Sequence, residues 1–147
     1  MKIHQLSLFL ENRPGTLKIP VKALADAKIN LLALCLADTS EFGILRLIVR
    51  EWEKGKEALA KAGCVVNVTE VLALDVSDQP GGLANVLGIL DEAQLEIEYM
   101  YAFTSGARGK KAALIFRFED PDAAIKVLEK HGINIIAPVE LFARVEN

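Results

Sequence analysis

The sequence predicts an α+β protein in which one unit of four strands and two helices is built twice. The first observation is a turn segment, Asn-Arg-Pro-Gly-Thr-Leu at residues 12–17, which returns as Asp-Gln-Pro-Gly-Gly-Leu at residues 78–83, 66 positions later. The second is that apolar positions remain in register beyond this motif, as Leu24 does with Leu90. The third is that strand-like and helix-like patterns follow each other in the same order in both halves. Self-similarity at a fixed spacing indicates a repeat, so each copy should be a folding unit of about 70 residues.

The first strand and the first helix of copy one are separated by the turn segment. Apolar and polar residues alternate over Ile3–Leu10, which predicts a strand with one covered face. Apolar residues then recur at helical spacing and predict a helix over Thr16–Ala27. Pro20 lies inside this helix and has no backbone N–H, so we expect the helix to start late or loosely.

A hairpin, a helix and a strand complete the first copy. Ile29–Ala37 and Phe42–Arg50 are apolar runs on either side of four polar residues, which predicts two paired strands. A second helix is predicted over Trp52–Ala62, where Gly63 ends it, because glycine is the preferred residue after a helix terminus. Cys64–Val68 is the last predicted strand.

The second copy repeats this order. Asp120 and Pro121 favour the start of its second helix, since aspartate accepts free backbone donors and proline is tolerated at the first helical position. The predicted elements are strand Val71–Val76, helix Leu83–Ala93, strands Leu95–Phe103 and Lys111–Glu119, helix Asp122–His131 and strand Ile133–Phe142.

This element order defines the fold class and the domain boundaries. Strand, helix, strand, strand, helix, strand is the order of a ferredoxin-like α+β sandwich, an antiparallel sheet covered by two helices on one face. We therefore expect two such domains, residues 1–69 and residues 70–147. Only Val68–Val71 separates the copies, which is too short for a flexible linker, so we expect one rigid body.

Strand parity predicts which residues fill the core. The positions expected under the helices are Leu6, Leu8, Leu10, Leu45, Leu47 and Val49 in copy one and Leu72, Leu74, Val76, Leu114, Phe116 and Phe118 in copy two. The residues of opposite parity form a sheet face that mixes charged and apolar side chains and suits partial burial. They are Arg46, Ile48 and Arg50 in copy one and Ile115, Arg117 and Glu119 in copy two. Aromatic residues occupy every second position of one predicted strand, at Tyr99, Tyr101 and Phe103. This pattern indicates packing in a core or an interface.

Composition limits the classes of function. The 147 residues are 52% hydrophobic with a net charge of −3, so the chain can bury a core and has no basic surface for nucleic acid. The N-terminus runs directly into a strand, and no apolar run is long enough for a membrane helix. We therefore expect a cytoplasmic protein.

Cysteines and histidines give no metal or disulfide pattern. Cys35 and Cys64 have no matching cysteines in copy two and are expected to be reduced, buried apolar residues. His4 and His131 lack metal-ligand spacing and are expected on the surface. Residues 105–111 resemble a phosphate-binding loop only faintly, because they lack its spacing and lie in a predicted hairpin. No metal or cofactor site is expected.

The turn motif resembles that of the ACT domains, small ligand-binding regulatory modules. In copy one it consists of Asn12, Arg13, Pro14, Gly15, Thr16 and Leu17, and in copy two of Asp78, Gln79, Pro80, Gly81, Gly82 and Leu83. The resemblance covers both halves and implies a stand-alone pair of ACT units without a catalytic domain. A glycine at the strand-to-helix turn allows close approach of a ligand, and the adjacent helix start favours a carboxylate.

The resemblance implies that a small amino acid binds where two ACT units meet. Its loop would be residues 12–17, and Asn30 would reach in from the neighbouring unit. In serine-binding ACT domains asparagines occupy these two places, and copy one has both. Copy two carries Asp78 and Glu96 there, so its site is expected to be altered, weaker or empty. Occupancy would be signalled to a partner, either a regulated enzyme or another copy in a homo-oligomer such as a dimer.

Other interpretations remain open. The Pro-Gly turns could serve the fold alone, and the protein could be a structural or regulatory subunit that binds no ligand. An acylphosphatase-like hydrolase could use Arg13 and Asn30, although no paired acid and base accompanies them. RNA recognition by this fold requires stacking aromatics on the central strands, and residues 44–49 contain none.

Overall fold

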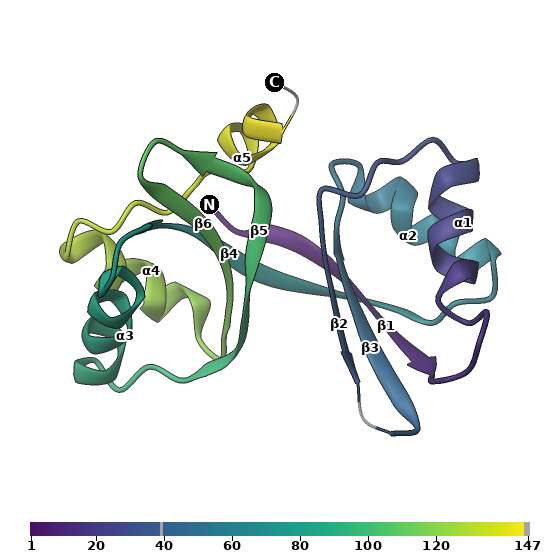
Figure 1. Cartoon of the computed structure of the whole chain (residues 1–147), viewed down its shortest axis with the longest axis horizontal. Coiled ribbons are helices and arrows are strands. Elements are labelled where there is room, and N and C mark those ends of the chain that lie inside the picture. Colours follow the sequence, from purple (N-terminus) through teal and green to yellow (C-terminus); the bar gives the residue numbers. More distant parts are fainter. Residues whose placement is uncertain (39, 146–147) are drawn as a thin grey trace. The chain divides into compact units, whose positions relative to one another are not determined.

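The computed structural model describes residues 1–38 and 40–145, which hold six strands and five helices (Figure 1). The chain forms two compact units. The first, here called the N-terminal unit, comprises His4–Thr69. The second, the C-terminal unit, comprises Met1–Ile3 and the chain from Glu70 onwards.

The N-terminal unit has the predicted ferredoxin-like order. Its strands follow the order β2-β3-β1-β4, and β3 pairs antiparallel with both β1 and β2. The helices α1 and α2 lie on one side of this sheet (Figure 1). The elements are β1 Ile3–Glu11, α1 Lys18–Asp26, β2 Ala33–Asp38, β3 Phe42–Ile48, α2 Trp52–Lys61 and the first residues of β4 Val66–Ser77.

The C-terminal unit repeats this arrangement with the remainder of β4, except for the last strand. Its strands follow the order β4-β6-β5, with β6 antiparallel to both neighbours. Helices α3 and α4 cover one face (Figure 1). The additional elements are α3 Gly82–Glu92, β5 Ile97–Arg108, β6 Lys111–Phe118, α4 Pro121–Lys130 and α5 Pro138–Val145.

The predicted last strand over Ile133–Phe142 is wrong. Its pairing with β4 is reduced to one bridge between Leu74 and Ile135, supported by a hydrogen bond from the Ile136 N–H to the Ala73 carbonyl at 2.8 Å. The chain then forms α5. Pro138 explains the change, because proline cannot donate to a strand ladder but is well suited to the first position of a helix.

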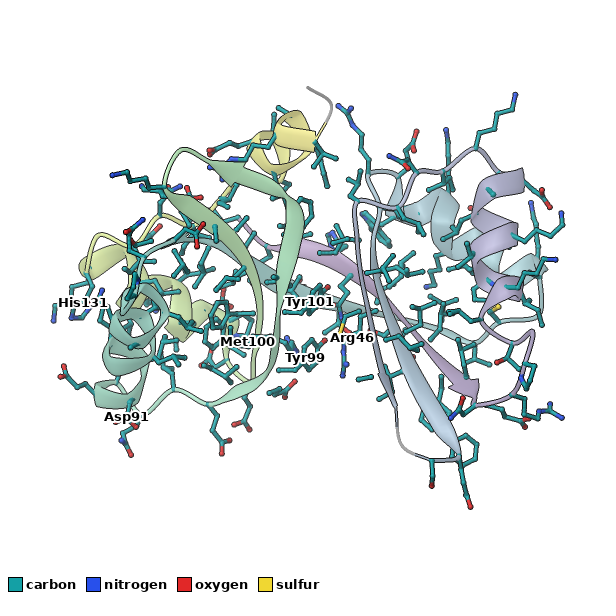
Figure 2. The ribbon with its side chains drawn as sticks, in the orientation of Figure 1. Arg46, Asp91, Tyr99, Met100, Tyr101 and His131 are labelled. Carbon is teal, nitrogen blue, oxygen red and sulfur yellow. The ribbon has the colours of Figure 1, made fainter. Side chains whose placement is uncertain are left out.

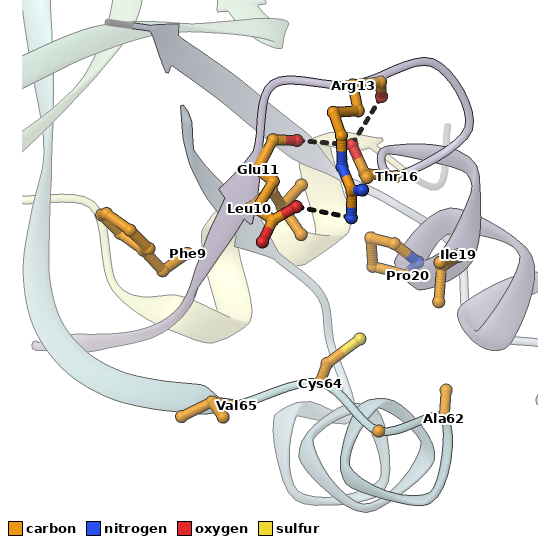
Figure 3. A pocket seen from close by; sticks show the side chains of 11 residues that line it. Phe9, Leu10, Glu11, Arg13, Thr16, Ile19, Pro20, Ala62, Cys64 and Val65 are labelled. Atoms are coloured by element: carbon orange, nitrogen blue, oxygen red, sulfur yellow. Dashed lines mark hydrogen bonds and ion pairs between the residues drawn. The ribbon is translucent and has the colours of Figure 1, made fainter. Parts of the chain in front are cut away.

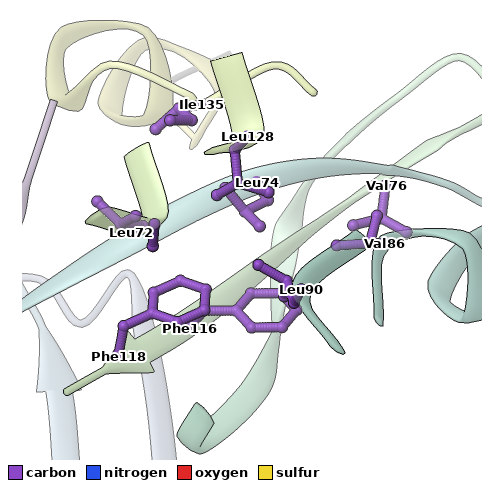
Figure 4. Close-up of a cluster of buried hydrophobic side chains, with 10 residues drawn as sticks. Leu72, Leu74, Val76, Val86, Leu90, Phe116, Phe118, Leu128 and Ile135 are labelled. Carbon is purple, nitrogen blue, oxygen red and sulfur yellow. The ribbon is translucent and has the colours of Figure 1, made fainter. Parts of the chain in front are cut away.

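The strand residues that parity places under the helices are all found in the two cores or partly buried against them. The N-terminal core contains Leu6, Leu8, Leu24, Ile29, Leu45, Leu47, Val49 and Leu59, with Leu10 partly buried against it. The C-terminal core contains Leu72, Leu74, Val76, Val86, Leu90, Phe116, Phe118, Ala124, Leu128 and Ile135, with Leu114 partly buried against it (Figure 4). These side chains join the sheet to its two helices in each unit.

The opposite sheet faces are mixed, as predicted. Arg46 and Arg117 are half-buried, Arg50 and Glu119 are exposed, and Ile48 and Ile115 are completely buried. On β5, Met100 turns towards the helix-covered core, whereas Tyr99 and Tyr101 lie on the other side of the strand (Figure 2).

Several element boundaries differ from the predictions. Helix α1 begins at Lys18, which confirms the expected late start. Strand β2 begins at Ala33 rather than Ile29, and the chain leaves α1 through Lys28, which has a φ of 58°. The strands predicted over Cys64–Val68 and Val71–Val76 form one continuous strand, β4.

The side chains expected to be inert are placed as follows. Cys35 and Cys64 are free, and they are half-buried rather than fully buried. His131 is exposed as predicted, but His4 is half-buried and stacks on Trp52 with ring centroids 4.4 Å apart. Residues 105–111 lie at the β5–β6 hairpin, as predicted. Within residues 1–38 and 40–145, no helix combines the length and apolarity needed to cross a bilayer.

Candidate functional site

The first turn segment is tied back onto the strand that precedes it. The hydroxyl of Thr16 lies 2.7 Å from the carbonyl oxygen of Glu11 and 2.9 Å from that of Arg13. The backbone N–H of Asn12 donates to the carbonyl of Glu41 at 2.8 Å. Gly15 has a φ of +90°, a conformation that other residues rarely adopt. These contacts fix the segment at the end of β1 and give it a defined shape.

Helix α1 starts directly behind this segment without a side-chain cap. Leu17 occupies the cap position, and its side chain makes no capping hydrogen bond. In contrast, Asp120 caps α4 by accepting a hydrogen bond from the Ala123 N–H at 3.0 Å. An uncapped helix start leaves backbone donors and partial positive charge near the turn segment.

A pocket of about 250 Å³, here called the loop pocket, lies beneath the first turn segment. It opens between the end of β1, the start of α1 and the connection from α2 to β4 (Figure 3). Its lining residues are Phe9, Leu10, Glu11, Arg13, Thr16, Ile19, Pro20, Ala62, Gly63, Cys64 and Val65.

The charges in the loop pocket belong to one ion pair. Arg13 Nη2 lies 2.5 Å from Glu11 Oε2, and both side chains are exposed. The thiol of Cys64 also lines the pocket, and burial raises its pKa, which keeps it neutral at pH 7. The pocket therefore combines one cation and one anion with otherwise uncharged walls.

A second hollow of about 350 Å³ is lined mainly by residues of α1. Gly15 borders this hollow, together with Lys18, Lys22, Ala23 and Asp26. Ile19 and Ala62 line both hollows. Residues of the first turn segment therefore border two hollows.

The second turn segment is built differently. The N–H of Asp78 donates to the carbonyl of Lys110 at 2.7 Å, which ties the segment to the β5–β6 hairpin. Gly81 has a φ of +89°, close to that of Gly15. Gly82 stands where Thr16 stands in copy one, and a Cβ atom there would lie 1.9 Å from the Ser77 carbonyl oxygen. The backbone itself therefore fills the space that the Thr16 side chain fills in copy one.

The predicted site residues of the two turn segments fall into three groups. Arg13 and Thr16 line the loop pocket, and Gly15 borders the second hollow. Asn12, Pro14 and Leu17 are exposed on the same segment but are not among the lining residues of either hollow. In copy two, Asp78, Gln79, Pro80 and Gly81 are exposed, whereas Gly82 and Leu83 are half-buried.

Asn30 and its counterpart Glu96 lie away from the turn segments of their own units. Both side chains are exposed. Asn30 follows the end of α1, whereas the first turn segment precedes its start, and nine helical residues separate them by about 14 Å. Asn30 can therefore meet a turn segment only if that segment comes from another unit.

The sequence did not point to most of the pocket walls. Glu11, Ile19, Pro20 and residues 62–65 contribute to the pocket without belonging to the repeated motif. One signal was present: Phe9 interrupts the polar face of β1 and is 64% exposed, which is unusual for a large aromatic residue. The contribution of residues 62–65 depends on the fold, because they follow α2.

Two ferredoxin-like units, each with a Pro-Gly turn between its first strand and first helix, define a duplicated α+β module. The chain belongs to the ACT domain family, since the family model described as an ACT domain pair matches residues 1–144. This match confirms the resemblance found in the sequence.

Solved structures agree with this assignment. The chain is 39% identical to protein BT0572 from Bacteroides thetaiotaomicron, over 97% of this chain and 96% of that one, with a TM-score of 0.88. It is also similar to the regulatory subunits of aspartate kinase from Thermus thermophilus, at 17% identity over 86% of this chain and 91% of that one, and from Thermus flavus, at 16% over 88% and 93%. Both have TM-scores of 0.59, and this likeness concerns the fold. Among curated proteins, none matches the chain.

Proposed function

We propose that this protein is a non-catalytic regulatory protein that binds a small amino acid at its first turn segment and passes the occupancy on to a partner. The observation that carries the proposal is the loop pocket, which lies directly beneath this segment and contains Arg13. An arginine side chain beside an uncapped helix start is a suitable environment for a carboxylate. An α-amino acid supplies that carboxylate.

The position of Asn30 supports a site completed by another unit. It lies at the far end of α1 from its own turn segment, so a neighbouring unit must contribute it, as the ACT resemblance implies. The end strand β2 offers a surface for such a neighbour, because Leu34 and Leu36 are 56% and 42% exposed. An unpaired strand edge with exposed leucines favours association with a second copy of the chain.

Signalling would follow from this shared site. A ligand that binds between two units stabilises the arrangement that forms the site, so it shifts the population towards that arrangement. The output would be a homodimer of changed geometry or a regulated enzyme that recognises one arrangement. The aspartate kinase relatives are named as regulatory subunits, which agrees with a role of this kind.

The experiment that tests the proposal is a scan of the protein amino acids for thermal stabilisation. A ligand at 100 times its dissociation constant adds about 2.7 kcal/mol to the free energy of unfolding. Asn12→Ala and Asn30→Ala should weaken the effect, whereas Asp78→Ala and Glu96→Ala, at the matching positions of copy two, should leave it unchanged. If no amino acid raises the melting temperature at millimolar concentration, the proposal is wrong.

A subunit that associates without binding a ligand is the second candidate. The exposed leucines of β2 are the observation that favours it, because they suit an interface whether or not the loop pocket is filled. Such a protein would associate with its partner equally well with and without amino acids. The hydrolase hypothesis is not supported, because α1 separates Arg13 from Asn30 within a unit, and Arg13 is paired with Glu11.

A further inference from the structure

We infer that the loop pocket takes an amino acid with an apolar side chain, as a zwitterion, and that each chain binds one. The inference rests on the proposed function and adds the class of ligand. Arg13 receives the carboxylate, Glu11 receives the ammonium group, and the ligand side chain lies against the apolar walls of the pocket.

The charge pattern of the pocket matches a zwitterion. In the free protein, Arg13 and Glu11 neutralise each other at 2.5 Å. Both side chains are exposed, at 72% and 55%, and exposed ion pairs contribute little to stability, so the pair opens easily. A zwitterion offers each of them a new partner of opposite charge, whereas a simple carboxylic acid would leave Glu11 without one.

The walls below this pair are apolar. Figure 3 shows Glu11, Arg13 and Thr16 on one side of the pocket, with Ala62, Cys64 and Val65 facing them across it. The Thr16 hydroxyl is already within hydrogen-bond distance of two backbone carbonyls. Its proton is therefore already used, so a ligand group that needs a hydrogen-bond donor would lose water without gaining one from this hydroxyl.

The free protein leaves apolar surface of the pocket in contact with water. Phe9, Ile19 and Val65 are 64%, 52% and 78% exposed. Phe9 is held in place by stacking on Phe42, with ring centroids 5.1 Å apart. An aliphatic or thioether side chain would cover this surface, and burial of apolar area favours binding.

The size of the pocket suits a single amino acid. Pockets for drug-sized ligands and cofactors enclose about 300–1,000 Å³. The loop pocket encloses about 250 Å³ and therefore suits a smaller molecule.

Copy two lacks the features on which this inference depends. Ser77 and Gln79 stand where Glu11 and Arg13 stand, so the ion pair is missing. The wall positions are polar as well. The residues that match Phe9, Ile19, Ala62 and Val65 are Asp75, Asn85, His131 and Asn134. One ligand per chain is therefore expected.

Isothermal titration calorimetry on the full chain tests the ligand class. Leucine or methionine should bind with one site per chain, at least tenfold more tightly than serine, aspartate or lysine. The leucine analogues 4-methylpentanoate, which lacks the ammonium group, and 3-methylbutylamine, which lacks the carboxylate, should each bind at least tenfold more weakly than leucine.

Variants test the assigned residues. Glu11→Ser with Arg13→Gln gives the first segment the residues of the second, and it should abolish leucine binding. Ile19→Asp changes an exposed wall residue and should weaken binding at least tenfold. Ser77→Ala with Gln79→Ala is the matched control in copy two and should bind leucine normally.

The outcomes separate this inference from the proposed function. Serine or aspartate binding as tightly as leucine, 4-methylpentanoate matching leucine, or two sites per chain would overturn the inference and leave amino-acid binding intact. Leucine binding that survives both Glu11→Ser with Arg13→Gln and Ile19→Asp would overturn the assignment of the pocket. If none of the amino acids binds, the proposed function itself is overturned.

Discussion

Arg144 near the end of α5 holds Asp75 near the end of β4 through two parallel hydrogen bonds. Arg144 Nη1 lies 2.7 Å from Asp75 Oδ1, and Nη2 lies 2.9 Å from Oδ2. Asn134 Nδ2 also donates to Oδ2 at 2.7 Å, and Glu140 pairs with Arg144 from the preceding turn. The side chains of Arg144 and Asp75 are only 4% and 6% exposed. This pair attaches α5 to the sheet of the C-terminal unit.

Removing one partner of this pair should destabilise the C-terminal unit. Asp75→Asn keeps the shape of the side chain but leaves the largely buried charge of Arg144 with Glu140 as its remaining carboxylate partner, and such a loss typically costs about 1–3 kcal/mol. Urea unfolding at pH 7 measures the difference in free energy of unfolding. The double variant Asp75→Leu with Arg144→Met should recover most of the loss, since it leaves no buried charge unpaired. A cost below about 1 kcal/mol for Asp75→Asn would show that α5 is not held by this pair.

The same pair gives a defined pH dependence. The hydrogen bonds from Arg144, and next from Asn134, hold the pKa of Asp75 below its usual value, against the opposing effect of burial. A carboxyl group with a lowered folded-state pKa stabilises the protein above its unfolded pKa, about 3.9, and this contribution is lost as pH falls through the folded pKa. The stability difference between the native chain and Asp75→Asn should therefore be constant from pH 7 to about pH 5 and shrink below about pH 4. A difference that already declines between pH 7 and pH 5 would contradict the assignment to Asp75.

The sequence was sufficient for the repeated fold because strand alternation fixes which side chains face the helices. Leu6 and Leu8 in copy one, and Leu72 and Leu74 in copy two, are at most 1% exposed, as their parity predicts. A shift of one residue would turn every one of them to the opposite face, so the register is strongly determined.

The sequence was insufficient where a local signal competed with the repeat. The match to copy one predicted a strand after Ile133, but Pro138 cannot donate to a strand and starts α5 instead. Glu140 and Arg144, four residues apart, were a further helix signal. The pocket walls at residues 62–65 could not be predicted, because their distance from Arg13 is set by the packing of α2 and not by any pattern along the chain.

Gly82 should be far less tolerant of substitution than Gly88. A Cβ atom at this position would lie 1.9 Å from the Ser77 carbonyl oxygen, so backbone must move, and Gly82→Ala should cost about 1–3 kcal/mol. Gly88, in the same helix, is the matched control. A Cβ atom there meets nothing within 4 Å, and Gly88→Ala should stabilise the protein by about 0.5–1 kcal/mol. Thermal unfolding of both variants gives the comparison, and equal effects of the two substitutions would contradict the close approach at Gly82.

Thr16 should control both the order of the first turn segment and its affinity for ligand. Its hydroxyl has one proton and lies within hydrogen-bond distance of the carbonyls of Glu11 and Arg13, the two residues that carry the charges of the loop pocket. Thr16→Val keeps the volume of the side chain but removes this hydroxyl, at a cost of about 0.5–1.5 kcal/mol for the lost hydrogen bond. Amide hydrogen exchange at residues 12–17 should become faster, and ligand should bind more weakly, because the ligand must then order the segment.

Thr16→Ser separates the hydroxyl from the methyl group and serves as the control. Serine retains the hydroxyl beside the carbonyls of Glu11 and Arg13, so exchange at residues 12–17 and ligand affinity should remain close to those of the native chain. Exchange at the second segment, residues 78–83, should not respond to either variant, because Gly82 takes the place of Thr16 there. If Thr16→Ser loosened the first segment as much as Thr16→Val, the methyl group and not the hydroxyl would order the segment.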